Sequence, residues 1–150
     1  MKIFVGADHR GFLLKNKIIR FLEKKGFKPG DLGIKRKGVI CDYPLISLKV
    51  AEAVAANKGS RGILACMTGI GHSIAANKIP SIRAALCYNR ESALLSRKHN
   101  DANVLIISSR FVEQKQINGI ITVWLKARFE GGRHLRRVNQ IKKIEKKFSR

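Results

Sequence analysis

The sequence predicts an α/β protein with a five-stranded parallel sheet in a three-layer α/β/α arrangement, followed by a C-terminal helix. Short apolar runs of strand length alternate along the chain with longer segments whose apolar residues recur at helical spacing. Strict alternation of this kind favours parallel strands joined by right-handed crossovers. The 150 residues contain no internal repeat or linker, so a single domain over residues 1–150 is expected, with enough length to bury a core.

The first elements are expected to be a strand, a helix and a weak strand. Residues 2–7 form an apolar run ended by a polar turn, and the helical pattern after it is stopped by Gly26. The weak strand covers residues 28–32. Its Pro29 cannot donate to a ladder hydrogen bond, which predicts a position at the edge of the sheet.

The middle of the chain is expected to carry the central strand. A basic loop over residues 33–44 leads into a helix with an apolar stripe over 46–54. A turn then enters the strand at 63–66, which is followed by a glycine-containing loop and a short helix at 73–77.

The last third continues the alternation. Strands are expected at 83–87 and 104–107, and helices at 91–98 and 117–124. A glycine pair then precedes a basic terminal helix at about 133–148, whose apolar stripe requires a partner surface.

The stretch over residues 63–78, ILACMTGIGHSIAANK, reads as strand, glycine loop and helix. Ligands bind outside the carboxyl ends of parallel strands, and the N–H groups of a helix N-terminus favour anions there. Cys66 sits at that edge. It is either a reactive thiol that faces an anionic ligand or a buried cysteine that packs as a small hydrophobe.

Composition narrows the functional classes. The formal charge of +21 could indicate nucleic-acid binding, but the basic residues are spread along the chain and aromatic residues do not interleave with them. We therefore expect no specific nucleic-acid partner. A phosphorylated small substrate would also give the excess of positive charge a role.

The three cysteines include no Cys-x-x-Cys pair and no histidine at metal-ligand spacing, so no metal site is predicted. The pattern suits reduced thiols in the cytoplasm. No apolar run approaches the length of a membrane span, and no membrane partner is expected.

Polar side chains that could do chemistry lie next to strand ends, and all but one pair follow a strand's carboxyl end. They are Asp8 and His9 after the first strand, Cys66 after the third, His99 and Asn100 before the fifth, and Arg110 after it. Such a group could transfer protons on an anionic substrate. The alternatives are that Asp8 caps a helix, that His99 and Asn100 end one, and that Arg133 and Arg137 are merely exposed.

Two nucleotide-binding motifs fit poorly. Gly69 and Gly71 resemble the start of a dinucleotide fingerprint, but Ile74 occupies the third glycine position. No Gly-Lys-Ser or Gly-Lys-Thr of a phosphate loop occurs.

Five ordered motifs, VGADHRG, CDYP, CMTGIGHSIAANK, RKHNDANVL and FEGGRHLRRV, resemble the ribose 5-phosphate isomerase B family, which also includes galactose 6-phosphate isomerase subunits. The resemblance covers nearly the whole chain and implies a Rossmann-like fold. It implies the cofactor-free and metal-independent interconversion of ribose 5-phosphate and ribulose 5-phosphate through an enediolate, a reaction of the pentose phosphate pathway.

The same resemblance implies roles for particular residues. Cys66 is the base that moves a proton between C1 and C2, His99 opens the furanose ring, and Thr68 belongs with them in the catalytic group. Backbone N–H groups of the central loop would stabilise the oxyanion. These loop residues are Met67, Thr68, Gly69, Ile70 and Gly71.

The resemblance also implies which residues contact the phosphate and which contact the sugar. The phosphate-contacting positions are His9, Arg110, Arg133 and Arg137, and those near the sugar are Asp8, Tyr43 and Asn100. Family members are dimers or tetramers with sites shared between subunits. A homodimer or homotetramer is therefore expected here, with the terminal helix at an interface.

Three residues depart from the family pattern. Met67 and Ser108 stand where glycine is usual, and a positive φ at Met67 would strain the backbone by roughly 1–3 kcal/mol. His72 occupies the position of a glutamate base in the branch of the family that lacks the cysteine. The hypothesis is that His72 tunes Cys66 through a hydrogen bond, and the alternative is that it faces solvent.

The predicted function is that of a ribose 5-phosphate isomerase of the B type. A six-carbon sugar phosphate isomerase, acting on galactose or allose 6-phosphate, is the alternative within the enzyme class. A noncatalytic binder of anions or nucleic acid is the alternative from another class.

Overall fold

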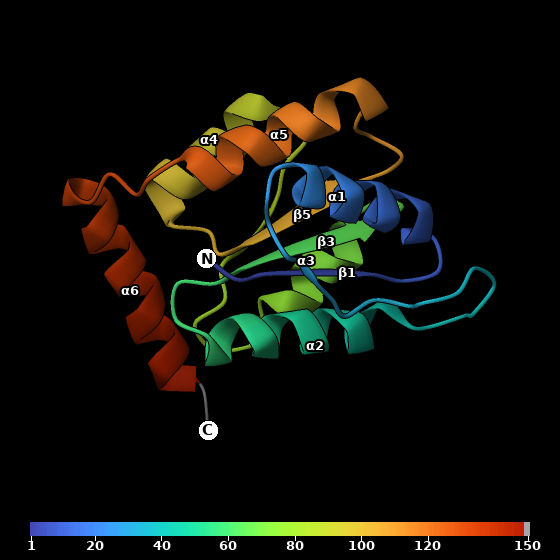
Figure 1. Ribbon diagram of the computed structural model, residues 1–150. Helices are drawn as coiled ribbons and strands as arrows, with labels where there is room; N and C mark the ends of the chain where they lie inside the picture. The colour runs from blue at the N-terminus through green and yellow to red at the C-terminus, as the bar shows by residue number, and fades with distance from the viewer. Residues whose placement is uncertain (149–150) are drawn as a thin grey trace.

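The computed structural model describes residues 1–148 and contains a five-stranded, fully parallel sheet with helices on both faces (Figure 1). The strand order is β2-β1-β3-β5-β4. The strands are β1 (Ile3–Ala7), β2 (Gly30–Asp31), β3 (Arg61–Cys66), β4 (Ala84–Leu86) and β5 (Val104–Ser108). The predicted fold class is confirmed.

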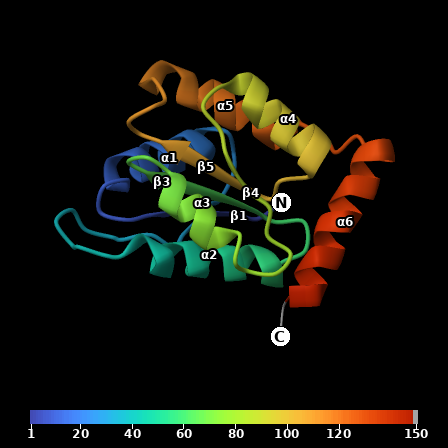
Figure 2. The same cartoon turned by 180° about the vertical axis from the view of Figure 1, so that it is seen from behind.

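Helices form a layer on each face of the sheet, and the two views in Figures 1 and 2 agree on this arrangement. One layer contains α1 (Phe12–Lys24), α4 (Arg90–Asn100) and α5 (Gln114–Lys126), and the other contains α2 (Tyr43–Ala56) and α3 (Ile70–Ala76). The terminal helix α6 (Gly132–Phe148) stands apart from both layers, beside the end of the sheet at which the strands begin.

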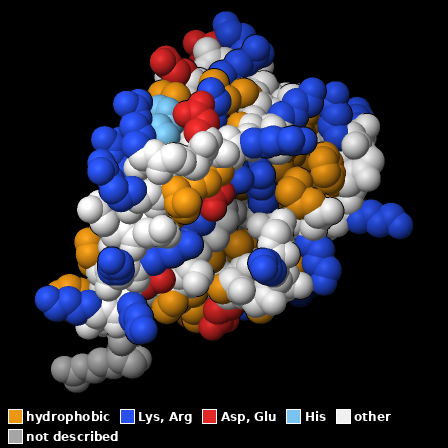
Figure 3. Space-filling model, turned by 90° about the vertical axis from the view of Figure 1, so that its left-hand side faces the viewer, with side chains coloured by type: hydrophobic (Ala, Val, Ile, Leu, Met, Phe, Trp, Pro, Cys, Tyr) orange, Lys and Arg blue, Asp and Glu red, His pale blue; other side chains and the backbone are white. Residues whose placement is uncertain are grey.

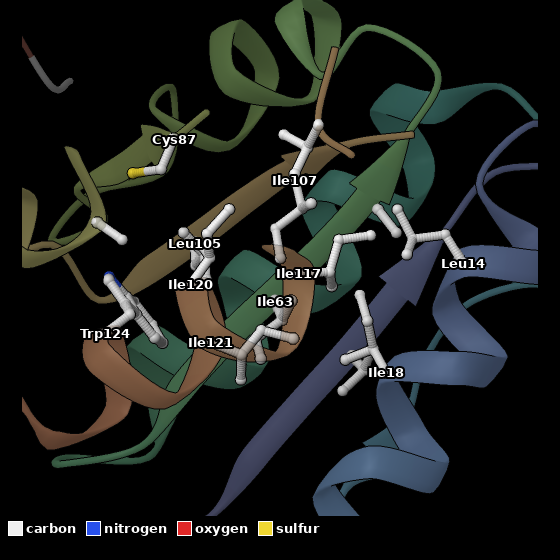
Figure 4. Packing of buried hydrophobic residues seen from close by; sticks show 14 of the residues in the cluster. Leu14, Ile18, Ile63, Cys87, Leu105, Ile107, Ile117, Ile120, Ile121 and Trp124 are labelled. Atoms are coloured by element: carbon white, nitrogen blue, oxygen red, sulfur yellow. The ribbon is translucent and has the colours of Figure 1, made fainter. Parts of the chain in front are cut away.

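The core is divided in two by the alternation of side chains along the strands. In β3, Ile63 and Ala65 join the cluster under α1 and α5, whereas Leu64 joins the cluster under α2. Figure 4 shows Trp124 of α5 in the first cluster, close to Leu105 of the central strands. Fully burying each such aliphatic side chain stabilises the fold by about 1.5–3 kcal/mol.

The second strand lies at the edge of the sheet, as Pro29 predicts, but it is only two residues long. A buried lysine ties this short strand to the first helix. The ammonium of Lys15 donates to Asp31 Oδ2 at 2.6 Å and to the carbonyl oxygen of Ile34 at 2.8 Å. The contacts of Lys15 therefore stabilise the position of β2, which has few backbone hydrogen bonds to β1.

Two helices have different limits from those expected. The helix α3 begins at Ile70 rather than at residue 73, because Gly69 turns the chain with a φ of +83° and serves as its N-cap. The helix α4 extends past residue 98 to include His99 and Asn100, and Asp101 ends it in a left-handed conformation. The interpretation that His99 and Asn100 end a helix is thus confirmed.

Among the described residues, no helix combines the length and the apolar character that crossing a membrane requires.

Candidate active site

The thiol of Cys66 is held in a polar environment at the carboxyl end of β3. Its Sγ lies 3.7 Å from Asp8 Oδ2, and the backbone N–H groups of Gly69, Thr68 and Met67 approach the sulfur. Burial raises the pKa of the Cys66 thiol, the Asp8 charge raises it further, and the three N–H groups oppose both effects. The thiol is therefore buried and also in contact with polar groups.

Asp8 is fixed by the turn between β1 and α1. Its Oδ1 accepts hydrogen bonds from the backbone N–H groups of Arg10 and Gly11, at 3.1 and 2.9 Å. The N-cap of α1 is Gly11, so the expected alternative of Asp8 as the helix cap is wrong. With Oδ1 engaged in this way, Oδ2 faces the Cys66 thiol.

The loop after Cys66 depends on close backbone packing. A Cβ on Gly69 would lie 2.6 Å from Leu86 Cδ1, and one on Gly71 would lie 2.6 Å from the Tyr43 ring. The Thr68 hydroxyl accepts from the Ile70 N–H at 3.4 Å. These contacts pack Tyr43 against the loop that follows Cys66.

Ser108 anchors this loop from the end of β5. Its buried hydroxyl donates to the carbonyl oxygen of Met67 at 2.6 Å and accepts from the N–H groups of Arg110 and Phe111. Within residues 1–148, the non-glycine residues with positive φ are Ser81 and Asp101. The strain considered for Met67 is therefore absent, and the serine at the second unusual position has a clear structural role.

His72 is fully buried, so the interpretation that it faces solvent is wrong. Its Nδ1 lies 2.6 Å from Ser47 Oγ, and its ring packs edge-on against Tyr43 at 5.8 Å. One of its ring nitrogens lies within 4.8 Å of the thiol of Cys66 and of the Asp8 carboxylate. Burial lowers the pKa of His72 to about 4, although the Asp8 charge opposes the shift, so the imidazole is neutral at pH 7.

Basic residues lie in the loops at the carboxyl ends of β1 and β5. His9 is exposed, and its Nδ1 lies 3.2 Å from the carbonyl oxygen of Cys41 in the long loop. Arg110 is exposed at the end of β5. Arg10, which was not among the predicted site residues, also lies here, and its Nη1 contacts Met67 Sδ at 3.3 Å.

The other predicted residues form a second group around α4 and α6. The rings of His99 and His134 stack at 4.0 Å, and the Nε2 atom of each lies 3.7 Å from Glu130 Oε2. Arg133 and Arg137 are exposed on α6. Sequence reasoning missed Glu130 and His134 as site residues, although both lie within the motif FEGGRHLRRV that it quoted.

The two groups lie at opposite ends of the sheet. The strand register pairs Gly62 with Val104 at one end and Cys66 with Ser108 at the other, a span of about 13 Å. His99 comes before Val104 and so lies beyond the far end (Figure 1). One chain therefore does not bring His99 to Cys66.

The end of the molecule that carries α6 is strongly basic, as Figure 3 shows by its spread of lysine and arginine side chains with histidine among them. A hollow of about 680 Å³ lies there between α6 and β4, lined among others by Arg83, Asn100 and Phe148. It does not reach Cys66.

A family model described as Ribose/Galactose Isomerase matches residues 3–141. The chain belongs to the ribose/galactose isomerase family. It is 46% identical to ribose-5-phosphate isomerase B of Escherichia coli over 146 residues, covering 97% of each chain.

Solved structures agree with this assignment to the ribose/galactose isomerase family. Ribose-5-phosphate isomerase B of Clostridium thermocellum is 50% identical with a TM-score of 0.95, and the match covers 99% of this chain and 100% of that one. The enzyme of Mycoplasma genitalium with bound ribulose-5-phosphate is 43% identical with a TM-score of 0.92, covering 97% and 96%.

The geometry of this family member supports proton transfer. A thiol, a carboxylate and three N–H donors converge at one strand end, and the Arg10 guanidinium contacts the side chain of the adjacent Met67. Such a set can remove a proton and stabilise the oxyanion that results.

Proposed function

We propose that the chain is an aldose–ketose isomerase that interconverts ribose 5-phosphate and ribulose 5-phosphate through an enediolate, without a cofactor. The observation that carries this proposal is the Cys66 thiol held between the Asp8 carboxylate and the N–H groups of its loop. Similarity over nearly full length to enzymes of this name supports the substrate.

In the proposed reaction the Cys66 thiolate removes the proton from C2 of the open-chain aldose. The resulting enediolate is stabilised by the N–H groups of residues 67–71, and the thiol returns the proton to C1. The hydroxyl proton passes from O2 to O1, beside the Thr68 hydroxyl. Each step conserves charge and needs no redox partner.

We assign ring opening to His99 and sugar contacts to Asp8, Tyr43 and Asn100. We propose that His9, Arg110, Arg133 and Arg137 hold the phosphate. Phosphate binding remote from the reacting carbons helps to orient them. Because one chain separates these residues into two groups, the proposal requires a second copy.

We therefore propose a homodimer, or a homotetramer built from it, in which α4 and α6 of one copy complete the Cys66 site of the other. Unpartnered apolar side chains support such an interface. Near the thiol, Leu45, Ile70 and Ile74 are each more than half exposed. On α6 only Val138 of the predicted apolar stripe is buried, and the exposed members are Leu135, Ile141, Ile144 and Phe148.

The three free thiols among the described residues support a reducing compartment, and we propose a cytoplasmic location.

The deciding experiment measures conversion of ribose 5-phosphate to ribulose 5-phosphate in the presence of a chelator. Loss of a general base lowers the rate by about 10²–10⁴-fold, and this is expected for Cys66→Ala. The matched control is Cys41→Ala, which removes another thiol and is expected to retain activity. Galactose 6-phosphate and allose 6-phosphate, tested in parallel, decide between the five-carbon and six-carbon substrates.

Two results would contradict the proposal. Turnover unaffected by Cys66→Ala would assign the base to another group, with His72 as the candidate. No turnover on any sugar phosphate, together with salt-dependent association with nucleic acid, would favour the noncatalytic binder.

A further inference from the structure

Three metal-ligating side chains meet beside the loop that follows Cys66. Asp8, Cys66 and His72 each offer one ligand atom, and these atoms lie within 4.8 Å of one another. All three residues are at least nine-tenths buried. The distance of 3.7 Å between Cys66 Sγ and Asp8 Oδ2 is close to the edge of about 3.6 Å expected between a sulfur and an oxygen on a tetrahedral Zn²⁺.

The hydrogen bonds of Ser47 are compatible with a His72 tautomer that could bind a metal. Ser47 has one hydroxyl proton, which it donates to the carbonyl oxygen of Tyr43 at 3.0 Å. In that arrangement the contact of 2.6 Å between Ser47 Oγ and His72 Nδ1 uses the proton of the imidazole. His72 Nε2 then carries the lone pair, which is the tautomer that a metal ligand requires.

This second nitrogen is an independent indication of a ligand. His72 Nε2 is buried and has no hydrogen-bond partner among the described residues. A buried acceptor without a partner is costly, and coordination would satisfy it. A metal-ligating histidine usually donates its other N–H to an oxygen, and Ser47 provides that contact.

The remaining two ligands also suit a cation. Asp8 is held in place through Oδ1, which leaves Oδ2 beside the thiol. A thiolate and a carboxylate together balance the charge of a divalent ion, and a sulfur, nitrogen and oxygen set is typical of zinc.

We propose that Asp8, Cys66 and His72 form a binding site for a thiophilic divalent cation such as Zn²⁺, and that its occupation inhibits the enzyme. On binding, a metal–sulfur bond forms and the thiol proton leaves to solvent, with no change of oxidation state. Water occupies the fourth position. The sulfur lone pair that the isomerisation needs is then occupied by the bond to the metal. The inhibition thus rests on the proposed function, whereas the binding does not.

The test is a titration of the purified full chain with Co²⁺, in phosphate-free buffer with a non-thiol reductant. A near-ultraviolet sulfur-to-cobalt charge-transfer band is expected to saturate at one Co²⁺ per chain, and Zn²⁺ is expected to displace it. Zn²⁺ is also expected to stop the isomerisation at the same occupancy, and a chelator to restore it.

Variants assign the ligands. Loss of an outer contact weakens metal binding about 10- to 100-fold, which is expected for Ser47→Ala, and His72→Ile is expected to weaken it by at least about 100-fold. Cys66→Ser preserves the volume of the side chain and is expected to abolish the band. His134→Asn is the matched control, because it removes a ligand from the cluster of His99, Glu130 and His134 at the other end and leaves the band unchanged.

The proposal is overturned if no band forms at saturating Co²⁺, or if the band survives Cys66→Ser. Unchanged affinity in natively folded His72→Ile would also overturn it. If His72→Ile does not fold, an unchanged affinity in Ser47→Ala is decisive against it. A band with the expected variant effects in a protein that does not isomerise sugar phosphates would leave the metal site standing and remove the proposed function.

Discussion

At the scale of single residues, the environment of Cys66 sets how the proposed base would work. Burial and the Asp8 charge raise the pKa of its thiol, and the backbone N–H groups of Gly69, Thr68 and Met67 lower it. Because the thiol keeps its proton longer than usual, the thiolate fraction at neutral pH is small. The sulfur that does ionise is a stronger base.

The raised pKa of Cys66 predicts that the rate of isomerisation rises with pH through the neutral range and beyond the ordinary thiol pKa of 9.0. Asp8→Asn removes the charge that raises the pKa of Cys66 and keeps an acceptor for the two N–H groups. The midpoint of the pH profile of kcat is therefore expected to move to lower pH. An unmoved midpoint would mean that the titrating group is not this thiol.

A second residue-scale prediction concerns Ser108. Ser108→Ala removes three hydrogen bonds, and because the Arg110 N–H still donates to the Met67 carbonyl oxygen at 3.1 Å, the group left without a partner is the Phe111 N–H, which costs about 1–3 kcal/mol of unfolding free energy. The loop that follows Cys66 also loses the hydrogen bond from Ser108 to Met67, so kcat is expected to fall. Urea denaturation and steady-state kinetics measure the two effects. Ser109→Ala, at the exposed neighbour, serves as the control, and equal stability of both variants would contradict the role of Ser108.

At the scale of secondary-structure elements, a buried ion pair supports the edge of the sheet. Lys15 of α1 is 1% exposed and reaches Asp31 in the two-residue strand β2. Burial alone would raise the pKa of Asp31, but hydrogen bonds from Lys15, Gly33 and Lys35 and the Lys15 charge lower it overall. A carboxyl with a lowered pKa stabilises the folded state above its unfolded pKa, and this contribution is lost as the pH falls through the folded pKa.

Lys15→Met is expected to lower the unfolding free energy by about 1–3 kcal/mol at neutral pH, since it removes the buried partner of Asp31 and leaves the exposed Lys35 as the cation beside that carboxylate. The difference from the parent should shrink as the pH falls below the ordinary Asp value of 3.8. Denaturant titrations at several pH values measure this. Lys24→Met, at an exposed position of the same helix, is the control, and an equal loss in both variants would count against the ion pair.

At the scale of the whole molecule, the parallel sheet separates the two groups of site residues. Cys66 ends β3, whereas His99 lies beyond the start of β5. The proposed reaction needs both residues, which is why a second copy enters the proposal.

Complementation tests this arrangement. Cys66→Ala and His99→Asn are each expected to be nearly inactive alone. When subunits are mixed at random after unfolding and refolding together, half of the dimers carry both variants and have one intact site of two, so about a quarter of the parent activity should return. A mixture that stays inactive, although exchange of subunits is demonstrated, would place the whole site within one chain or exclude the dimer.

The sequence alone determined the order of strands and helices, the edge position of the second strand and the loop after Cys66. Each of these depends on local chemistry. Hydrophobic periodicity distinguishes a helix from a strand, Pro29 cannot donate in a central ladder, and glycine permits the backbone of Gly69. The motifs that resemble a known family also lie in such local stretches.

Only the tertiary structure decided which of the predicted residues meet. The distance between Cys66 and His99 follows from the register of β3 and β5, and the burial of His72 follows from the packing of α3 against Ser47 on α2. The role of Ser108 depends on a carbonyl group 41 residues away in the chain. These contacts join segments that are distant in sequence, and no local pattern records them, because packing forces rather than backbone preferences bring them together.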